Sequence, residues 1–229
     1  CLWIDDEHLD EALSIAAIER RVARTEAMRL ASRDKGANQM AERAHQMREM
    51  NIAKHIAIVV PAITSENREY LPCGIINRYS TITNKCYALF DAPTWSLALI
   101  ASRLHWVWIG TVCVRMRTDF SYSNTLGWNT FPIPKLTEKN KEDLTKCAEE
   151  ILLAREAHFP GTIADLYDPE KMPDNLRKAH ERNDEVLERI YIGRRFKNDT
   201  ERLEKLFDLY TKMTQSTAPK KANSKKKVS

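Results

Sequence analysis

Glycine is scarce in this sequence, and its scarcity excludes several cofactor-binding loops. The chain of 229 residues contains six glycines, and no two of them lie close together. They occupy positions 36, 74, 110, 127, 161 and 193. Loops that bind a dinucleotide, a nucleoside triphosphate or a methyl donor need clustered glycines, because the backbone must approach the ligand closely. We therefore expect this segment to bind no such cofactor.

Patterns for metal binding and nucleophilic catalysis are also missing. The five cysteines include no C-x-x-C pair, and the six histidines include no H-x-x-x-H pair, so zinc-ligand spacing is absent. There is no G-x-S-x-G motif, and His105 lies in an apolar segment that is typical of a core histidine. We predict no metal ligand and no catalytic residue. The odd cysteine count indicates reduced thiols, and hence a cytoplasmic protein.

Outside the C-terminal residues, neither positive nor negative charge is in large excess. Lys and Arg total 36, Asp and Glu total 32, and the net charge is +4. Residues 216–229 hold five lysines and no acid, and without these lysines the net charge would be about −1. We expect this segment to be a disordered, solvated tail. The overall charge neither supports nor excludes DNA binding.

One long apolar run, residues 95–114, has only Arg103 and His105 as ionisable groups. An arginine near the centre of a membrane span costs roughly 2.5–3.5 kcal/mol on insertion scales. We therefore interpret the run as a buried helix from Thr94 to about Trp108, followed by a strand, and not as a membrane span.

The remaining periodicity predicts an α+β fold. Before residue 95 we expect a helix over residues 8–33 with Gly36 as its C-cap, a short polar helix, and short strands. The short helix is expected over residues 38–49, and the strands at residues 56–60, 70–71, 74–76 and 86–90. Residues 115–134 show an extended pattern that a Pro-x-Pro closes. Beyond them we expect three helices capped by Thr137, Asp174 and Asn198. The predicted domains are a mixed domain with a small sheet and packed helices, residues 1–136, and an all-α helical domain, residues 137–215.

Arginines on the first predicted helix form i,i+4 pairs, Arg20 with Arg24 and Arg29 with Arg33. Like charges at this spacing destabilise an isolated helix, but a phosphate backbone would turn the repulsion into binding. The alternative is an ordinary surface helix whose charge nearby acids balance.

A second pattern is Arg115-x-Arg117-x-Asp119-x-Ser121. On one strand, the period of two would place all four side chains on the same face. Arginine can contact guanine and aspartate can accept from cytosine in the major groove. The pattern therefore predicts contacts to base edges, although an ordinary cross-strand ion pair would look the same.

Several blocks make the sequence similar to the C-terminal part of the MmeI-like DNA methyltransferases, the type IIG restriction–modification enzymes. The blocks are residues 1–4 (CLWI) with the helix reaching 29–32 (RLAS), 65–72 (SENREYLP), 91–95 (DAPTW), 118–124 (TDFSYSN), 128–132 (WNTFP), 164–169 (ADLYDP), 172–173 (MP) and 176–180 (LRKAH).

The resemblance implies a target recognition domain followed by a C-terminal helical extension. It implies that Arg117 and Asp119, with Ser121 nearby, contact a base pair of double-stranded DNA. Arg115 belongs to the same predicted row, and a cation followed two residues later by an acid would suit a G·C pair with guanine facing Arg117. Phosphate contacts would come from the arginine helix and its surroundings. The residues expected there are Arg20, Arg24, Arg29, Arg33, Lys35 and Arg68.

The resemblance further implies a bacterial, S-adenosylmethionine-dependent, adenine-specific methyltransferase as the parent protein, with or without a fused endonuclease. The chain lacks the Asn-Pro-Pro-aromatic motif that grips a flipped base, so we expect this segment to be inactive alone and to act with a methyltransferase domain of the same polypeptide. Its apolar start also suggests a piece of a longer protein. Two alternatives stay open: a separate DNA specificity subunit that acts in trans, and a structural protein-interaction domain.

Overall fold

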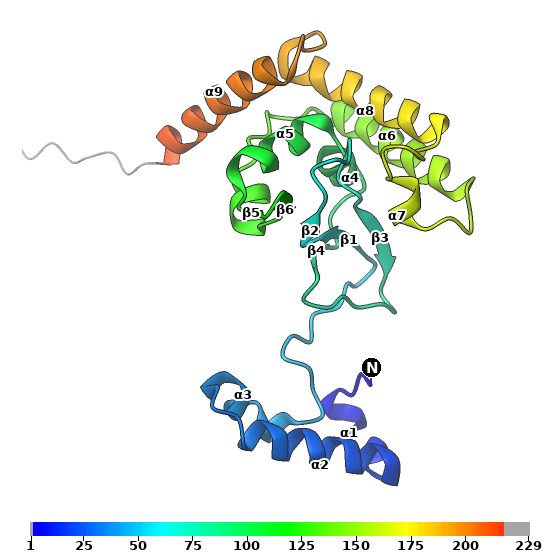
Figure 1. Ribbon diagram of the computed structural model, residues 1–229, viewed down its shortest axis with the longest axis vertical. Coiled ribbons are helices and arrows are strands. Elements are labelled where there is room, and N and C mark those ends of the chain that lie inside the picture. The colour runs from blue at the N-terminus through cyan, green and yellow to red at the C-terminus, as the bar shows by residue number, and fades with distance from the viewer. Residues whose placement is uncertain (1, 218–229) are drawn as a thin grey trace, which may run out of the picture. The chain divides into compact units, whose positions relative to one another are not determined.

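The computed structural model describes residues 2–217 and divides the chain into two compact units, Cys1–Ile52 and Ala53–Ser229 (Figure 1). Residues 218–229, most of the expected lysine-rich tail, lie outside the described residues.

The first unit is helical. It contains η1 (Asp6–His8), α1 (Leu9–Leu13), α2 (Ala16–Leu30), α3 (Lys35–Gln39) and η2 (Ala41–Arg43). The single helix predicted over residues 8–33 is wrong, because the chain breaks between α1 and α2 and α2 ends at Leu30. Gly36 is not a C-cap: it lies inside α3, where the Asp34 carboxylate accepts from its backbone N–H. The polar helix expected at 38–49 is replaced by α3 and η2.

The described part of the second unit, residues 53–217, contains two small antiparallel sheets. Strands β1 (Ile56–Pro61), β3 (Gly74–Asn77) and β4 (Cys86–Phe90) form the first sheet in the order β3-β1-β4. Strands β2 (Ile63–Thr64), β5 (Arg115–Met116) and β6 (Asp119–Ser121) form the second in the order β2-β6-β5. The strand expected at residues 70–71 is wrong: Tyr70 and Leu71 lie in a loop, where both are buried.

The apolar run is buried, but as two helices, α4 (Trp95–Ile100) and α5 (Arg103–Val112). The Ser102 hydroxyl accepts from the His105 N–H and so caps α5, which ends the first helix and starts the second. The expected strand after Trp108 is absent because α5 continues to Val112. The extended segment at 115–134 is interrupted by a π-helical turn, η3 (Asn124–Trp128). No helix among residues 2–217 is long and apolar enough to cross a membrane.

Between residue 136 and residue 217 the structure describes four helices: α6 (Glu138–Glu156), α7 (Ile163–Leu166), α8 (Asp174–Ile192) and α9 (Asp199–Thr217). Thr137 caps α6 with a capping box, as predicted. Asn198 accepts from the Glu201 N–H as predicted, whereas the cap of α8 is Pro173 and not Asp174.

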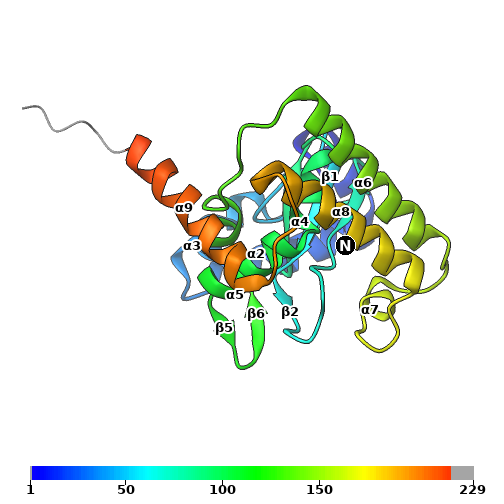
Figure 2. The same ribbon diagram turned by 90° about the horizontal axis from the view of Figure 1, so that it is seen from above.

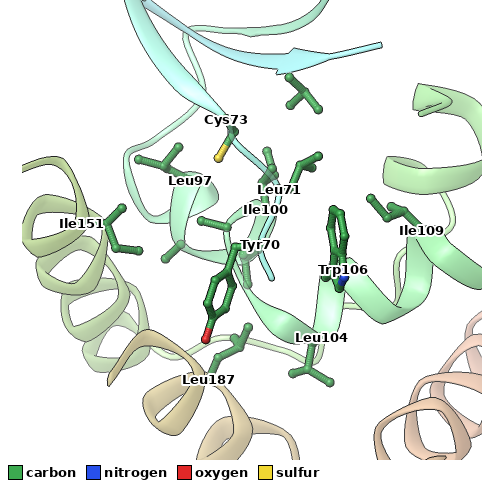
Figure 3. Close-up of a cluster of buried hydrophobic side chains, with 14 of the residues drawn as sticks. Tyr70, Leu71, Cys73, Leu97, Ile100, Leu104, Trp106, Ile109, Ile151 and Leu187 are labelled. Atoms are coloured by element: carbon green, nitrogen blue, oxygen red, sulfur yellow. The ribbon is translucent and has the colours of Figure 1, made fainter. Parts of the chain in front are cut away.

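One core connects these helices to the sheet region. Leu97 and Ile100 of α4 belong to the same buried cluster as Ile151 of α6 and Leu187 of α8 (Figure 3). The chain on both sides of residue 136 therefore shares one hydrophobic interior.

Buried polar groups also join the helices to the sheet region. Tyr70 donates to Asp184 at 3.0 Å, and the Arg103 N–H donates to the same carboxylate at 2.7 Å. Burial raises the pKa of Asp184 to about 7 despite these donors. Burial lowers the pKa of His105 and of His180 to about 3. All three groups are held in their neutral forms over part of the acidic range, so the stability of the fold depends on pH.

We predict that the protein loses less of its free energy of unfolding in acid when His105 is replaced, as in His105→Phe. Because the folded pKa of His105 lies below its unfolded value, its contribution to stability is present above about pH 6.5 and lost as pH falls toward 3. Asp184 acts in the opposite sense, since its contribution is lost as pH rises through about 7. The free energy of unfolding can be measured with denaturant at several pH values between 6.5 and 4. As the pH falls, it should decrease less steeply in the variant, by roughly 1 kcal/mol per pH unit. Equal slopes would show that folded His105 binds its proton as readily as unfolded His105.

Candidate nucleic-acid interface

Residues 115–121 form a tight hairpin and not a single strand (Figure 2). Arg115 pairs with Phe120, and Met116 pairs with Asp119. Arg117 lies in the turn between the strands with a φ of 60°, a left-handed conformation that few non-glycine residues adopt. The hairpin projects at the edge of the unit, next to β2 (Figure 2).

The hairpin separates the side chains that were expected to share one face. Residues paired across an antiparallel ladder lie on the same face, and neighbours along a strand lie on opposite faces. Arg115 therefore shares a face with Phe120, and its guanidinium lies 4.7 Å from the centre of that ring. Asp119 and Ser121 lie on the other face. The prediction of one row of four side chains is wrong because the chain reverses at residues 117–118.

Arg115 is held by other groups of the protein. It donates to the Glu66 carboxylate and, at 3.3 Å, to the carbonyl of Thr118. By contrast, Arg117 is exposed, and neither its side chain nor those of Asp119 and Ser121 has a hydrogen-bonding or ionic partner in the part of the chain that the structure describes. The hairpin thus presents a free cation at its tip and a free carboxylate on one face.

Arg29 differs from the other arginines expected to contact phosphates. Its guanidinium donates to the carbonyls of Met40, Arg43 and Gln46 at 2.8–2.9 Å. Arg29 therefore holds the 40–46 segment against α2, and three of its five N–H donors already bind backbone carbonyls.

The other predicted phosphate contacts in the first unit keep their donors free. Arg20, Arg24, Arg33 and Lys35 are exposed, and within residues 2–52 no side chain or backbone acceptor binds them. Arg20 and Arg24 lie on α2, and Lys35 is the first residue of α3. These four groups can still meet an external anion.

The sequence did not reveal how Arg68 and Glu66 lie relative to the hairpin. Glu66 binds Arg115, while Arg68 and Asp119 line the same hollow of about 320 Å³. No local pattern links residues so far apart in the chain, so only the fold could show these relations. Across residues 2–217, no three His, Cys, Asp or Glu side chains lie together as a metal site.

Comparisons with known proteins show which families and structures this chain is similar to. The family model of the MmeI target recognition domain matches residues 1–135, and that of the MmeI C-terminal domain matches residues 136–218. DNA methyltransferase A of Bacillus subtilis (strain 168) is 38% identical over 215 residues, 94% of this chain and 24% of that protein. A solved structure of the type IIL restriction–modification enzyme MmeI in complex with DNA matches with a TM-score of 0.89 and 29% identity. That match covers 94% of this chain and 29% of the MmeI chain. The chain spans about a quarter of the length of the methyltransferase.

We predict that Arg29→Ala loosens the 40–46 segment, because three backbone carbonyls lose their donor. A hydrogen bond to a charged donor contributes at most about 1.5–3 kcal/mol to stability. Water can bind the carbonyls in the variant, so the actual loss should be smaller. Hydrogen exchange should become faster across residues 40–46 in the variant. Arg24→Ala is the matched control, since Arg24 has no partner in its own unit. Unchanged exchange in Arg29→Ala would contradict the structural role of this residue.

Proposed function

Because the chain belongs to the MmeI family, with its target recognition and C-terminal domains, we propose that it is the DNA-recognition module of a sequence-specific methyltransferase. The α+β fold agrees with that of MmeI. The observation that carries the proposal is the projecting β5–β6 hairpin, on which Arg117 and Asp119 have no partner within residues 2–217. We place the functional division of the chain near residue 136, although both sides share a core.

The hairpin has the chemistry needed to distinguish base pairs. An arginine donates to guanine O6 and N7, and an aspartate accepts from cytosine N4, in the major groove. Arg117 at the tip, with Asp119 and Ser121 on one face, would supply such contacts. Arg115 would act indirectly, because its bond to Glu66 fixes the base of the hairpin.

The exposed cations of the first unit suit the phosphate backbone. Arg20, Arg24, Arg33 and Lys35 would bind phosphates, which adds affinity for every sequence and positions the module without discrimination. Arg29 is left out of this set because its donors bind the backbone.

The methyl transfer itself belongs to other parts of the parent protein. We propose an adenine-specific, S-adenosylmethionine-dependent enzyme that acts on DNA in the bacterial cytoplasm, with its methyltransferase domain in the same polypeptide. The residues of this chain do not fit the cofactor, because its six glycines are dispersed and none forms a close-approach loop with another. We therefore assign no step of the transfer to this segment and expect it to be inactive alone.

We predict that Arg117→Ala reduces discrimination at one base pair by about 1–3 kcal/mol, because it removes a base contact. The left-handed backbone at this position is equally strained for alanine, so the folding stability should change little. Binding of the parent protein to its preferred duplex and to single-mismatch duplexes measures the effect.

Arg24→Ala serves as the comparison. It should weaken binding to all duplexes by a similar factor. The slope of log binding constant against log salt concentration should become shallower by about one, as expected for the loss of one phosphate contact. An unchanged specificity ratio in Arg117→Ala would refute the base contact.

A further inference from the structure

A groove of about 730 Å³ is lined by the β3-β1-β4 sheet and by the α6–α7 region. Its lining is mostly apolar and includes Val59, Ile76, Leu152 and Ile163. Phe159, in the loop between α6 and α7, also lines the groove and is 87% exposed. An exposed side chain of this size beside an apolar groove is typical of a surface that another chain covers.

The sheet that forms one side of the groove is apolar on both faces. Ile58 is fully buried and belongs to the core. Its neighbour Val59 pairs with Gly74 and Ala88, so these three residues lie on the opposite face, where each is only partly buried. Phe90 lies on that face as well and is 41% exposed. An antiparallel sheet with one face on the core usually carries polar side chains on the other, so the apolar outer face also indicates a partner.

Strand β3 has a free edge. It lies at one end of the sheet order, and in the part of the chain that the structure describes no strand pairs with its outer side (Figure 1). The Asp91 N–H, just after β4, donates to the Ile56 carbonyl, so the backbone groups of Ile56 face β4. Those of Ala57 face β3, because successive residues of a strand alternate. Ala57 pairs with Ile76, so Ile75 directs its N–H and C=O away from β1. Neither of these two groups binds another described residue.

The chemistry of the groove suits an extended peptide and not DNA. Arg155 lines the groove, but it is buried and donates to the Cys73 carbonyl and the Tyr167 hydroxyl. The other described residues of the lining include no cation, so the groove offers no exposed positive charge to a phosphate. A free strand edge beside apolar side chains is an arrangement by which proteins bind an extended segment. The backbone of the segment pairs with the edge, and its alternate side chains enter the groove.

The relatives indicate the source of such a segment. This chain covers 24% of DNA methyltransferase A and 29% of the MmeI chain, so most of each relative has no counterpart here. A segment of the same polypeptide reaches the groove at a high effective concentration, so a short contact is enough. We propose that an extended segment from the rest of the parent polypeptide adds as a strand to β3 and places apolar side chains in the groove beside Phe159. This inference rests on the parent polypeptide of the proposed function and is independent of the base contacts.

Hydrogen exchange at single amides of the complete protein tests the proposal. In the wild-type protein the Ile75 N–H should exchange at least about tenfold more slowly than in an unstructured peptide, because the added strand supplies its acceptor. Phe159→Asp places a charge in the apolar groove and should abolish most of this protection. Exchange of the Ala88 N–H should not change, since Ala88 pairs with Val59 and directs its N–H out of the opposite edge of the sheet.

Tyr79→Asp is the matched control variant. Tyr79 is 80% exposed and does not line the groove, so the protection of Ile75 should persist. Melting curves establish that both variants are folded.

A photoreactive amino acid in place of Phe159 identifies the segment. Irradiation of the complete protein should cross-link position 159 to one segment of the same molecule that lies outside this chain. A mixture of protein with light and heavy isotopes separates cross-links within one molecule from cross-links between two.

Three outcomes would overturn the proposal. The first is an Ile75 amide that exchanges as fast as in an unstructured peptide. The second is protection that Phe159→Asp leaves unchanged. The third is a cross-link that joins two molecules, or the absence of any cross-link to a segment outside this chain.

Selection from a pool of duplexes with randomised positions tests the proposed function separately. A protein that selects a sequence but leaves Ile75 unprotected would refute only this inference. A protein that protects Ile75 but selects no sequence would refute only the proposed function.

Discussion

The base contacts that we propose depend on the pairing of β6 between β2 and β5, because this pairing decides which side chains of the β5–β6 hairpin share a face. This register places Phe120 toward the core and Asp119 on the opposite face, together with Ser121 and Ile63. A shift by one residue would turn every one of these side chains to the other face. The buried ring of Phe120 makes such a shift costly, because it would expose an aromatic core residue and bury a carboxylate.

The C-terminal helices stabilise the segment from which the hollow is built. Arg155 of α6 donates to the carbonyl of Cys73 at 2.7 Å and also binds Tyr167, next to α7. Asp184 of α8 accepts from Tyr70, which directly follows the Arg68 loop. These contacts are buried, so they connect the helical region to the loop with little competition from water. The helical region therefore supports the loop that precedes Tyr70, and α7 contributes part of the wall of the hollow.

Local sequence signals predicted the parts of the fold that depend on local physics. The β-branched run gave β1, and the Thr137 capping box gave the start of α6. The period-two argument failed at residues 115–121 because a turn without glycine or proline leaves no signal, and Arg117 adopts its left-handed backbone without either. The free state of Asp119 and the engagement of Arg29 depend on contacts between distant segments, which periodicity cannot show. The resemblance of the sequence blocks to the MmeI family indicated DNA recognition as the function, which no local pattern could show alone.

Cross-linking from the hairpin tip tests the central claim most directly. A photoreactive amino acid replaces Arg117 in the complete protein, and a second protein carries it at Tyr79, an exposed loop position whose side chain is 80% accessible. Both are irradiated on a duplex that contains the selected sequence. The account predicts that residue 117 cross-links to bases at one or two adjacent positions of that sequence, and that residue 79 does not. Cross-links from residue 117 that spread evenly over the flanking DNA, or that do not form, would contradict it.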